Sequence, residues 1–214
     1  MSLKAELDNA YASFQQAAPA AVIETFTTGI QDLHKTFDPS KAIQAGQTLP
    51  TFSLQDATGT PISSTTLLAN GPLLISFYRG SWCPFCNLEL RALQNHLPEF
   101  KAAGVTLVAI SPQLPDSSLS MAEKNALEFP VLSDIGNSLA RELGIVWTQP
   151  DSFKPILQGF QIDWKKSYGD ESFEVPIPAT ILVDRDGVVR NVFLDPAYTA
   201  RLEPGTALEW VAAL

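Results

Sequence analysis

Three apolar runs stand out along this chain of 214 residues, and they predict the strands of a central sheet. The runs comprise residues 73–78, 105–110 and 180–184. Each is continuous or nearly so, which is typical of strands covered on both faces. Helical patterns follow the first two runs, at residues 89–100, 119–127 and 137–143. Short connections of this kind build right-handed crossover units, so we expect an α/β fold.

Two tight hairpins are predicted at the edges of this sheet. Residues 51–55 and 60–62 alternate polar and apolar side chains, and turn residues lie between them. Asp186 and Gly187 carry the Asp-Gly signature of a hairpin and join the third apolar run to residues 188–194. Because a tight hairpin pairs its strands antiparallel, we expect a mixed sheet, followed by a final helix from about residue 204.

The first 45 residues are interpreted as a separate helical segment. Apolar residues recur at helical spacing over residues 3–37, and Pro19 divides this stretch into two helices. Residues 38–50 are rich in proline, glycine and small polar residues, which predicts a linker. We therefore expect an N-terminal helical extension and linker at 1–45 and one α/β domain at 46–214.

Composition narrows the class of partner and the location. The net charge is −9 and the pI is near 4.6, whereas nucleic acids and anionic membrane surfaces attract clustered Lys and Arg. We therefore expect neither as a partner. No apolar run approaches the ~20 residues of a membrane span, and acidic residues interrupt the N-terminus where a signal peptide would be apolar. On these grounds we expect a cytoplasmic protein.

The candidate chemistry lies in the only two cysteines of the chain, Cys83 and Cys86. They lie three residues apart in a Trp-Cys-Pro-Phe-Cys sequence, shortly after the first apolar run. A close CxxC pair in a reducing compartment is more often catalytic or metal-binding than structural. Tetrahedral zinc needs four ligands, and beyond the two thiols the chain offers only His34 and His96 among the nitrogen ligands. We therefore expect redox chemistry and no metal.

The helix predicted after Cys83 is expected to activate its thiol. Pro84 suits the first helical position, because its φ is fixed and it has no N–H to satisfy, and this makes Cys83 the N-cap. The sulfur of Cys83 would then accept a hydrogen bond from the N–H of Phe85 or Cys86, near the positive end of the helix dipole. Cys86 would attack an oxidised Cys83 from the same first turn and form a disulfide.

Four further residues are expected to shape the site. Trp82 is interpreted as a buried anchor that also shields the sulfurs from water. Arg79 either is an ordinary surface charge or places its guanidinium against the thiolate or a substrate oxygen. Pro178 stands at the start of a predicted strand, where proline is disfavoured. A cis peptide bond between Ile177 and Pro178 would explain that position.

Four segments of the chain carry a family likeness: residues 77–86, 108–112, 129–134 with 140–144, and 178–184 with Gly187. Through them the chain from about residue 46 resembles the peroxiredoxin-like branch of the thioredoxin superfamily, the group of alkyl hydroperoxide reductase and thiol-specific antioxidant proteins. The resemblance implies a thioredoxin-like fold, a central mixed β-sheet flanked by helices. It implies reduction of peroxides or disulfides by cysteine, no bound organic cofactor, and an external thiol reductant such as thioredoxin or glutathione. A homodimer is our expectation for the assembly.

The cysteine pair departs from the pattern of this family. The peroxiredoxin pattern PxxxTxxC places Arg79 at its proline, Cys83 at its threonine and Cys86 at its peroxide-attacking cysteine. The thioredoxin pattern WCxxC instead makes Cys83 the nucleophile and Cys86 the resolving thiol. Pro178 stands where peroxiredoxins usually carry an arginine and where thioredoxins carry a cis-proline. We therefore favour Cys83 as the nucleophile, with Cys86 as the alternative.

Three functions are compatible with these residues. The leading hypothesis is a thiol-dependent oxidoreductase that reduces hydroperoxides through a Cys83/Cys86 dithiol–disulfide cycle. A first alternative is a general thiol–disulfide oxidoreductase of the thioredoxin or glutaredoxin type. A second alternative is a redox-sensing interaction module without turnover, in which the amphipathic residues 1–37 bind a partner or a second subunit.

Overall fold

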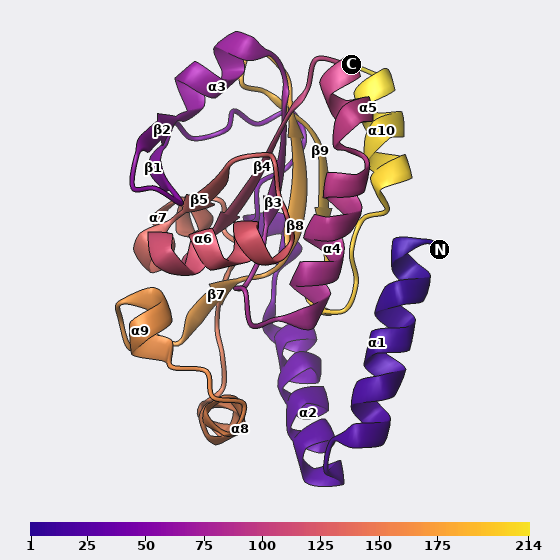
Figure 1. Ribbon diagram of the computed structural model, residues 1–214, viewed down its shortest axis with the longest axis vertical. Coiled ribbons are helices and arrows are strands. Elements are labelled where there is room, and N and C mark those ends of the chain that lie inside the picture. Colours follow the sequence, from indigo (N-terminus) through magenta and orange to yellow (C-terminus); the bar gives the residue numbers. More distant parts are fainter.

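The predicted mixed sheet forms the centre of the computed structural model, which describes residues 1–214 (Figure 1). Its seven strands are β1 (Ser53–Asp56), β2 (Pro61–Ser63), β3 (Leu73–Phe77), β4 (Thr106–Ser111), β5 (Val131–Ser133), β8 (Ala179–Val183) and β9 (Val189–Leu194). They lie in the order β2-β1-β5-β4-β3-β8-β9. Strand β4 pairs parallel with β3 and β5, and β8 pairs antiparallel with β3 and β9. The α/β class, the mixed sheet and both predicted hairpins are confirmed.

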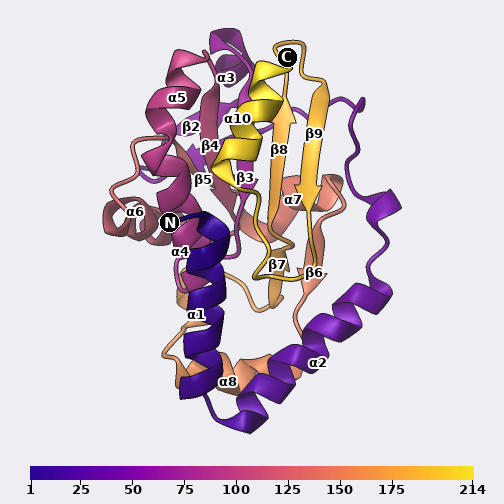
Figure 2. The ribbon, with the colours of Figure 1, turned by 90° about the vertical axis from the view of Figure 1, so that its right-hand side faces the viewer.

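Helices cover both faces of the sheet. On one face lie α4 (Pro84–Asn95), α5 (Leu97–Ala102), α6 (Pro115–Lys124) and α10 (Pro204–Ala212), and on the other α3 (Ser64–Asn70) and α7 (Ser138–Glu142). Successive side chains of a strand point to opposite faces, so Leu74 of β3 packs into the first core and Leu73 and Ile75 into the second. Figure 2 shows α4, α5 and α10 in front of the sheet.

Prolines set the helix boundaries that the apolar pattern placed wrongly. The pattern over 89–100 predicted one helix, but the structure has α4 and α5, which meet at His96. Pro98 lies in the first turn of α5 and has no N–H to continue the series of helical hydrogen bonds of α4. Helix α6 begins at Pro115 rather than at residue 119, because proline suits the first helical turn.

The N-terminal segment forms two helices, as predicted, and packs against the rest of the chain. Helix α1 spans Leu3–Ala17 and α2 spans Ala20–Thr36, with Pro19 as the N-cap of α2. Leu3 and Leu7 are buried in the same core as α4. The linker contains only the short helix η1 (Pro39–Lys41). Figure 2 shows α1 and α2 as a V below the sheet. The division of the chain at residue 45 stays a prediction.

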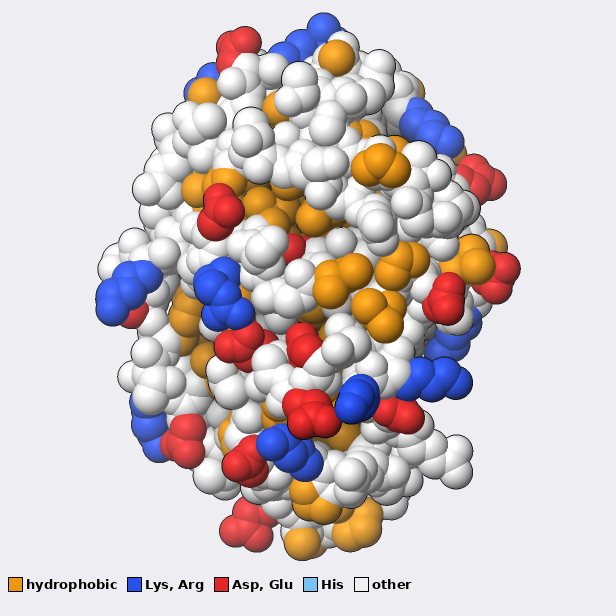
Figure 3. Space-filling model, turned by 90° about the vertical axis from the view of Figure 1, so that its left-hand side faces the viewer, with side chains coloured by type: hydrophobic (Ala, Val, Ile, Leu, Met, Phe, Trp, Pro, Cys, Tyr) orange, Lys and Arg blue, Asp and Glu red, His pale blue; other side chains and the backbone are white.

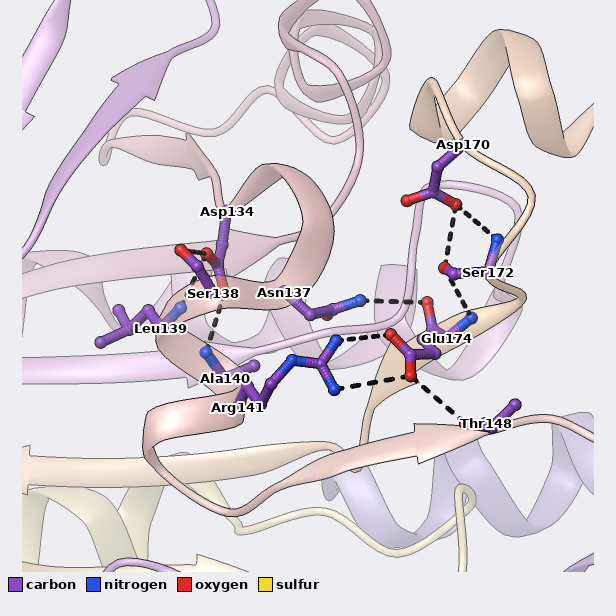
Figure 4. Close-up of polar contacts among 10 residues, drawn as sticks. All are labelled: Asp134, Asn137, Ser138, Leu139, Ala140, Arg141, Thr148, Asp170, Ser172 and Glu174. Carbon is purple, nitrogen blue, oxygen red and sulfur yellow. Dashed lines mark hydrogen bonds and ion pairs between the residues drawn. The ribbon is translucent and has the colours of Figure 1, made fainter.

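Residues 146–176 form an excursion that the sequence pattern did not predict. Strands β6 (Val146–Thr148) and β7 (Glu174–Pro176) pair antiparallel, and η3 (Asp151–Phe153), α8 (Lys154–Gly159) and α9 (Trp164–Tyr168) lie between them. Figure 4 shows how this excursion is tied to α7. Arg141 donates to Glu174 at 2.6 Å, and Asp134 accepts from the N–H groups of Leu139 and Ala140 at the start of α7, after η2 (Ile135–Asn137).

The surface of the molecule carries charged side chains of both signs on the face that Figure 3 shows. On the face that holds α6 and α9, acidic and basic side chains are interspersed (Figure 3). None of the helices has a stretch long and apolar enough to cross a lipid bilayer.

Candidate active site

The cysteine pair lies where β3 passes into α4. Cys83 is the N-cap of α4 and Pro84 is its first residue, as the sequence predicted. Cys86 follows in the first turn. Both cysteines are free thiols and neither exposes any surface to solvent. The helix start therefore holds two buried thiols in one turn, close to the positive end of its dipole.

Arg79 supplies a side-chain hydrogen bond to the Cys83 sulfur, since Arg79 Nη2 donates to Cys83 Sγ at 3.0 Å. The N–H of Phe85 makes no capping bond, whereas the N–H of Cys86 is among the groups that lower the pKa of Cys83. Burial alone would raise the pKa of Cys83, but the neighbouring Cys86 thiol and the charges of Arg79 and Arg201 hold it well below its ordinary value. Cys83 is therefore the thiolate of the pair.

Cys86 has the opposite protonation preference. Burial and the negative charge on Cys83 raise the pKa of Cys86 well above its ordinary value, against the pull of Arg201. Arg201 Nη2 lies 3.4 Å from Cys86 Sγ. Each sulfur thus has its own arginine, but the pKa values of the two thiols are shifted in opposite directions. The arrangement therefore favours the thiolate form of Cys83 and the protonated form of Cys86.

A buried ion pair fixes Arg201 beside Cys86. Arg201 Nε donates to Glu89 Oε2 at 2.5 Å, and both side chains are 1 % exposed. Ser76 Oγ donates to the other carboxylate oxygen at 3.3 Å. Burial raises the pKa of Glu89 to about 7, although Arg201 pulls it down. Arg201 Nη1 also donates to the backbone carbonyl of Tyr198 at 2.6 Å, so the guanidinium is held on several sides.

Aromatic side chains and one tyrosine hydroxyl hold Arg79. Its guanidinium lies 4.5 Å from the ring centre of Tyr198 and 5.0 Å from that of Trp82, within the range of cation–π attraction. Tyr168 Oη donates to the carbonyl of Arg79 at 2.7 Å and accepts from Trp82 Nε1 at 2.6 Å. A Cβ at Gly80 would lie 2.5 Å from that hydroxyl, so only glycine lets the loop approach Tyr168 this closely.

Three of the predicted site-shaping residues lie next to Cys83, namely Arg79, Trp82 and Pro84. The other two, Ile177 and Pro178, have no hydrogen bond to either cysteine. Both are buried just before β8, and the pairing of Ala179 with Phe77 puts them at the sheet end where the cysteine loop begins. All peptide bonds are trans, so the expected cis bond before Pro178 was wrong. Pro178 lies between β7 and β8, where its missing N–H leaves no ladder position unpaired.

Sequence reasoning missed Glu89, Arg201, Tyr168 and Tyr198. Glu89 could have been found, because it lies in the buried stripe of α4 with Cys86, Leu90 and Leu93, at the i, i+3, i+4, i+7 spacing of one helix face. A carboxylate in an apolar stripe calls for a buried partner. The other three carried no such signal, since their roles depend on how distant segments pack against the cysteine loop.

Comparison with known proteins gives the same family throughout. The family model described as "AhpC/TSA family" matches residues 45–192. Peroxiredoxin Bcp of Escherichia coli (strain K12) is 28 % identical over 153 residues, covering 72 % of this chain and 86 % of the relative. The chloroplastic peroxiredoxin Q of Sedum lineare is 33 % identical over 151 residues, covering 71 % of this chain and 69 % of the relative.

Solved structures show the same fold. Peroxidoxin BcpB from Mycobacterium tuberculosis superposes with a TM-score of 0.63 at 23 % identity, over 80 % of this chain and 98 % of that one. AhpC of Enterococcus faecalis gives a TM-score of 0.62 at 17 % identity, over 79 % of this chain and 91 % of that one. The helices α1 and α2, Tyr198 and Arg201 lie outside the residues that the family model matches. Since that model spans well over half of the residues, the chain belongs to the AhpC/TSA family and is a peroxiredoxin-like protein of the thioredoxin superfamily.

Proposed function

We propose that Cys83 and Cys86 carry out the reduction of hydroperoxides in this protein, with Cys83 as the attacking thiolate. Thiol-dependent peroxide reduction is the activity that the peroxiredoxin-like family and its Bcp and Q-type relatives support. The roles of the individual residues are our proposal. The observation that carries it is the hydrogen bond of 3.0 Å from Arg79 Nη2 to Cys83 Sγ, together with the opposite pKa shifts of the two thiols.

The first half-reaction oxidises Cys83. Its thiolate attacks the hydroxyl oxygen of ROOH, so that an S–O bond forms and the O–O bond breaks. The alkoxide RO⁻ leaves and takes a proton to become the alcohol ROH, or water where R is hydrogen. Cys83 becomes a sulfenic acid, and the peroxide has gained two electrons. Arg79 is the nearest cation to the reacting sulfur and can stabilise charge on both sulfur and oxygen.

The second half-reaction returns the pair to the dithiol. Cys86 loses its proton and attacks the Cys83 sulfenic sulfur, the S–S bond forms, and the hydroxyl leaves with that proton as water. Two thiol groups of an external reductant then reduce the Cys83–Cys86 disulfide and are themselves oxidised to a disulfide. We propose thioredoxin or glutathione as this reductant. The proposal includes a cytoplasmic location, since free CxxC thiols suit a reducing compartment. It also includes a homodimer.

Turnover with purified protein tests the function. Peroxide consumption is followed with thioredoxin or glutathione as reductant, for wild type, Cys83→Ser and Cys86→Ser. We expect wild type to turn over and Cys83→Ser to fall to background. With thioredoxin as the only reductant, we expect Cys86→Ser to consume at most one equivalent of peroxide. Turnover of mixed disulfides without consumption of any peroxide would instead support the general thiol–disulfide oxidoreductase. Failure of wild type to oxidise at all would contradict both.

A further inference from the structure

A pocket of about 260 Å³ borders the cysteine loop, and three of its ten lining residues, Phe14, Phe26 and Tyr198, lie outside the family match. Eight of its ten lining residues are hydrophobic, and Arg79 is the charged one. Phe14 of α1 and Phe26 of α2 form part of its wall, together with Phe160 after α8 and Tyr198. Figure 2 shows α8 behind the V formed by α1 and α2, and Figure 1 shows it to one side of both helices. The N-terminal helices thus reach the site.

Aromatic contacts hold these helices in place and lead to the reacting sulfur. Phe14 and Phe26 meet edge to face with ring centres 6.0 Å apart, and Phe26 lies 6.5 Å from Tyr198 in the same way. Tyr198 in turn lies over the guanidinium of Arg79, which donates to Cys83. A continuous set of contacts therefore runs from α1 to the thiolate.

Arg79 brings an unused hydrogen-bond donor to this pocket. The residue is 5 % exposed, and its Nε–H has no hydrogen-bond partner while Nη2 donates to Cys83. A buried donor without a partner is unfavourable, and an oxygen bound beside the guanidinium would satisfy it. The pocket thus combines an apolar wall with one donor next to the nucleophile. Such a combination fits a ligand with an apolar group at one end and an oxygen acceptor at the other.

We infer that α1 and α2 form the substrate wall of the active site, and that Phe14 and Phe26 are specificity-determining residues for hydroperoxides with a bulky apolar group. The apolar group lies against these two rings and the –OOH group lies at Arg79. This inference rests on the proposed function and assigns a role to the N-terminal helices. The pocket holds several times the ~30 Å³ that one water molecule occupies, far more than hydrogen peroxide fills. Cys83 is buried, so the last approach of the oxygen requires a local shift of its neighbours.

Substrate selectivity tests this inference. The readout is kcat/KM for cumene hydroperoxide divided by kcat/KM for hydrogen peroxide, in wild type, Phe14→Ala and Phe26→Ala. We expect each substitution to lower this ratio about tenfold, because a lost apolar contact in a binding pocket changes discrimination by about that factor. Val22→Ala is the matched control on α2, since Val22 does not line this pocket and its loss should leave the ratio unchanged. Phe26→Leu keeps an apolar side chain at this position and should keep most of the ratio. This variant shows whether the effect of Phe26→Ala comes from the lost apolar contact or from disturbed folding.

Binding without chemistry gives an independent readout. Cumyl alcohol, which lacks the reactive oxygen, is titrated into Cys83→Ser protein with and without Phe14→Ala, and chemical shifts are followed by NMR. We expect chemical-shift changes around the pocket, and we expect the Kd for cumyl alcohol to rise at least about tenfold with Phe14→Ala. An unchanged selectivity ratio in both phenylalanine variants would overturn the inference while leaving peroxidase activity intact. A changed KM for thioredoxin with an unchanged ratio would also overturn it, because the pocket would then bind the reductant. Loss of all peroxide turnover in wild type would instead contradict the proposed function.

Discussion

At the scale of single residues, the guanidinium of Arg79 is the group that separates Cys83 from an ordinary buried thiol. Its Nη2 donates to the sulfur at 3.0 Å, and Tyr198 and Trp82 hold the charge in place. A fully buried thiolate needs such a partner, because desolvation disfavours the charged form. Sequence alone left Arg79 open between a surface charge and a site residue, since nothing in the chain shows which way a loop arginine points.

Arg79→Gln should slow the reaction of Cys83 with peroxide at neutral pH. Hydrogen bonds to charged groups contribute about 1.5–3 kcal/mol, which corresponds to a loss of about tenfold to hundredfold in rate. Stopped-flow fluorescence with a single addition of peroxide measures the rate. Arg91→Gln on α4 is the matched control and should leave it unchanged, since Arg91 bonds to Asn125 instead. An Arg79→Gln rate equal to that of wild type would remove Arg79 from the mechanism.

Tyr168→Phe should loosen the loop that carries Arg79 and Trp82. The substitution removes the hydroxyl that bonds to the Arg79 carbonyl and to Trp82 Nε1. Leaving such buried groups without partners should lower the free energy of unfolding by about 1–3 kcal/mol. Urea denaturation measures this change. Tyr11→Phe is the control, because no hydrogen bond of the Tyr11 hydroxyl is present in the structure. Equal midpoints for wild type and Tyr168→Phe would contradict this role.

At the scale of elements, strands were predicted where they are long or where a turn signal marks them. The five- and six-residue strands β3, β4 and β8 are long apolar runs, and the three-residue strand β2 was found through its hairpin turn. The three-residue strands β5, β6 and β7 are too short to show a period of two and are not joined by a tight hairpin, so the pattern did not reveal them. The start of α4 was predictable because Pro84 fixes the first helical position and thereby the place of Cys83.

The contact between α4 and the segment before α10 depends on the Glu89–Arg201 pair. Arg201→Met should lower the free energy of unfolding by about 3–5 kcal/mol, because it leaves Glu89 buried without its partner. The double variant Glu89→Met/Arg201→Met should recover much of this loss, since no uncompensated charge remains. Guanidinium denaturation of both single variants and the double variant measures the coupling. Strictly additive losses would show that the two side chains do not act as a pair.

At the scale of the whole molecule, the proposed active site combines segments far apart in the chain. Cys83 and Arg79 lie in the middle, Phe14 and Phe26 near the start, and Arg201 near the end. The family likeness of the middle part was visible in its motifs. The packing of the terminal segments against this middle part could not be predicted. Helical spacing in residues 3–37 shows an apolar face without showing what that face covers.

The thiolate should also make the stability of the folded protein depend on pH. The pKa of Cys83 is lower in the folded state than in the unfolded chain, so its contribution is present above the unfolded value and is lost as the pH falls through the folded value. Wild type should therefore lose stability relative to Cys83→Ser as the pH is lowered from about 8.5, the ordinary pKa of a cysteine, towards the lower pKa of the folded state. Urea denaturation at several pH values gives the difference, and a difference independent of pH would rule out a Cys83 thiolate.

Locating the first oxidised sulfur tests the central claim most directly. Wild type, Cys83→Ser and Cys86→Ser are each treated with limiting peroxide and a dimedone-type reagent, and the labelled residue is identified by mass spectrometry. We predict a sulfenic acid label on Cys83 in the Cys86→Ser variant, little label in Cys83→Ser, and a Cys83–Cys86 disulfide in wild type. A label that forms on Cys86 in Cys83→Ser, with none on Cys83 in Cys86→Ser, would contradict the account and make Cys86 the nucleophile.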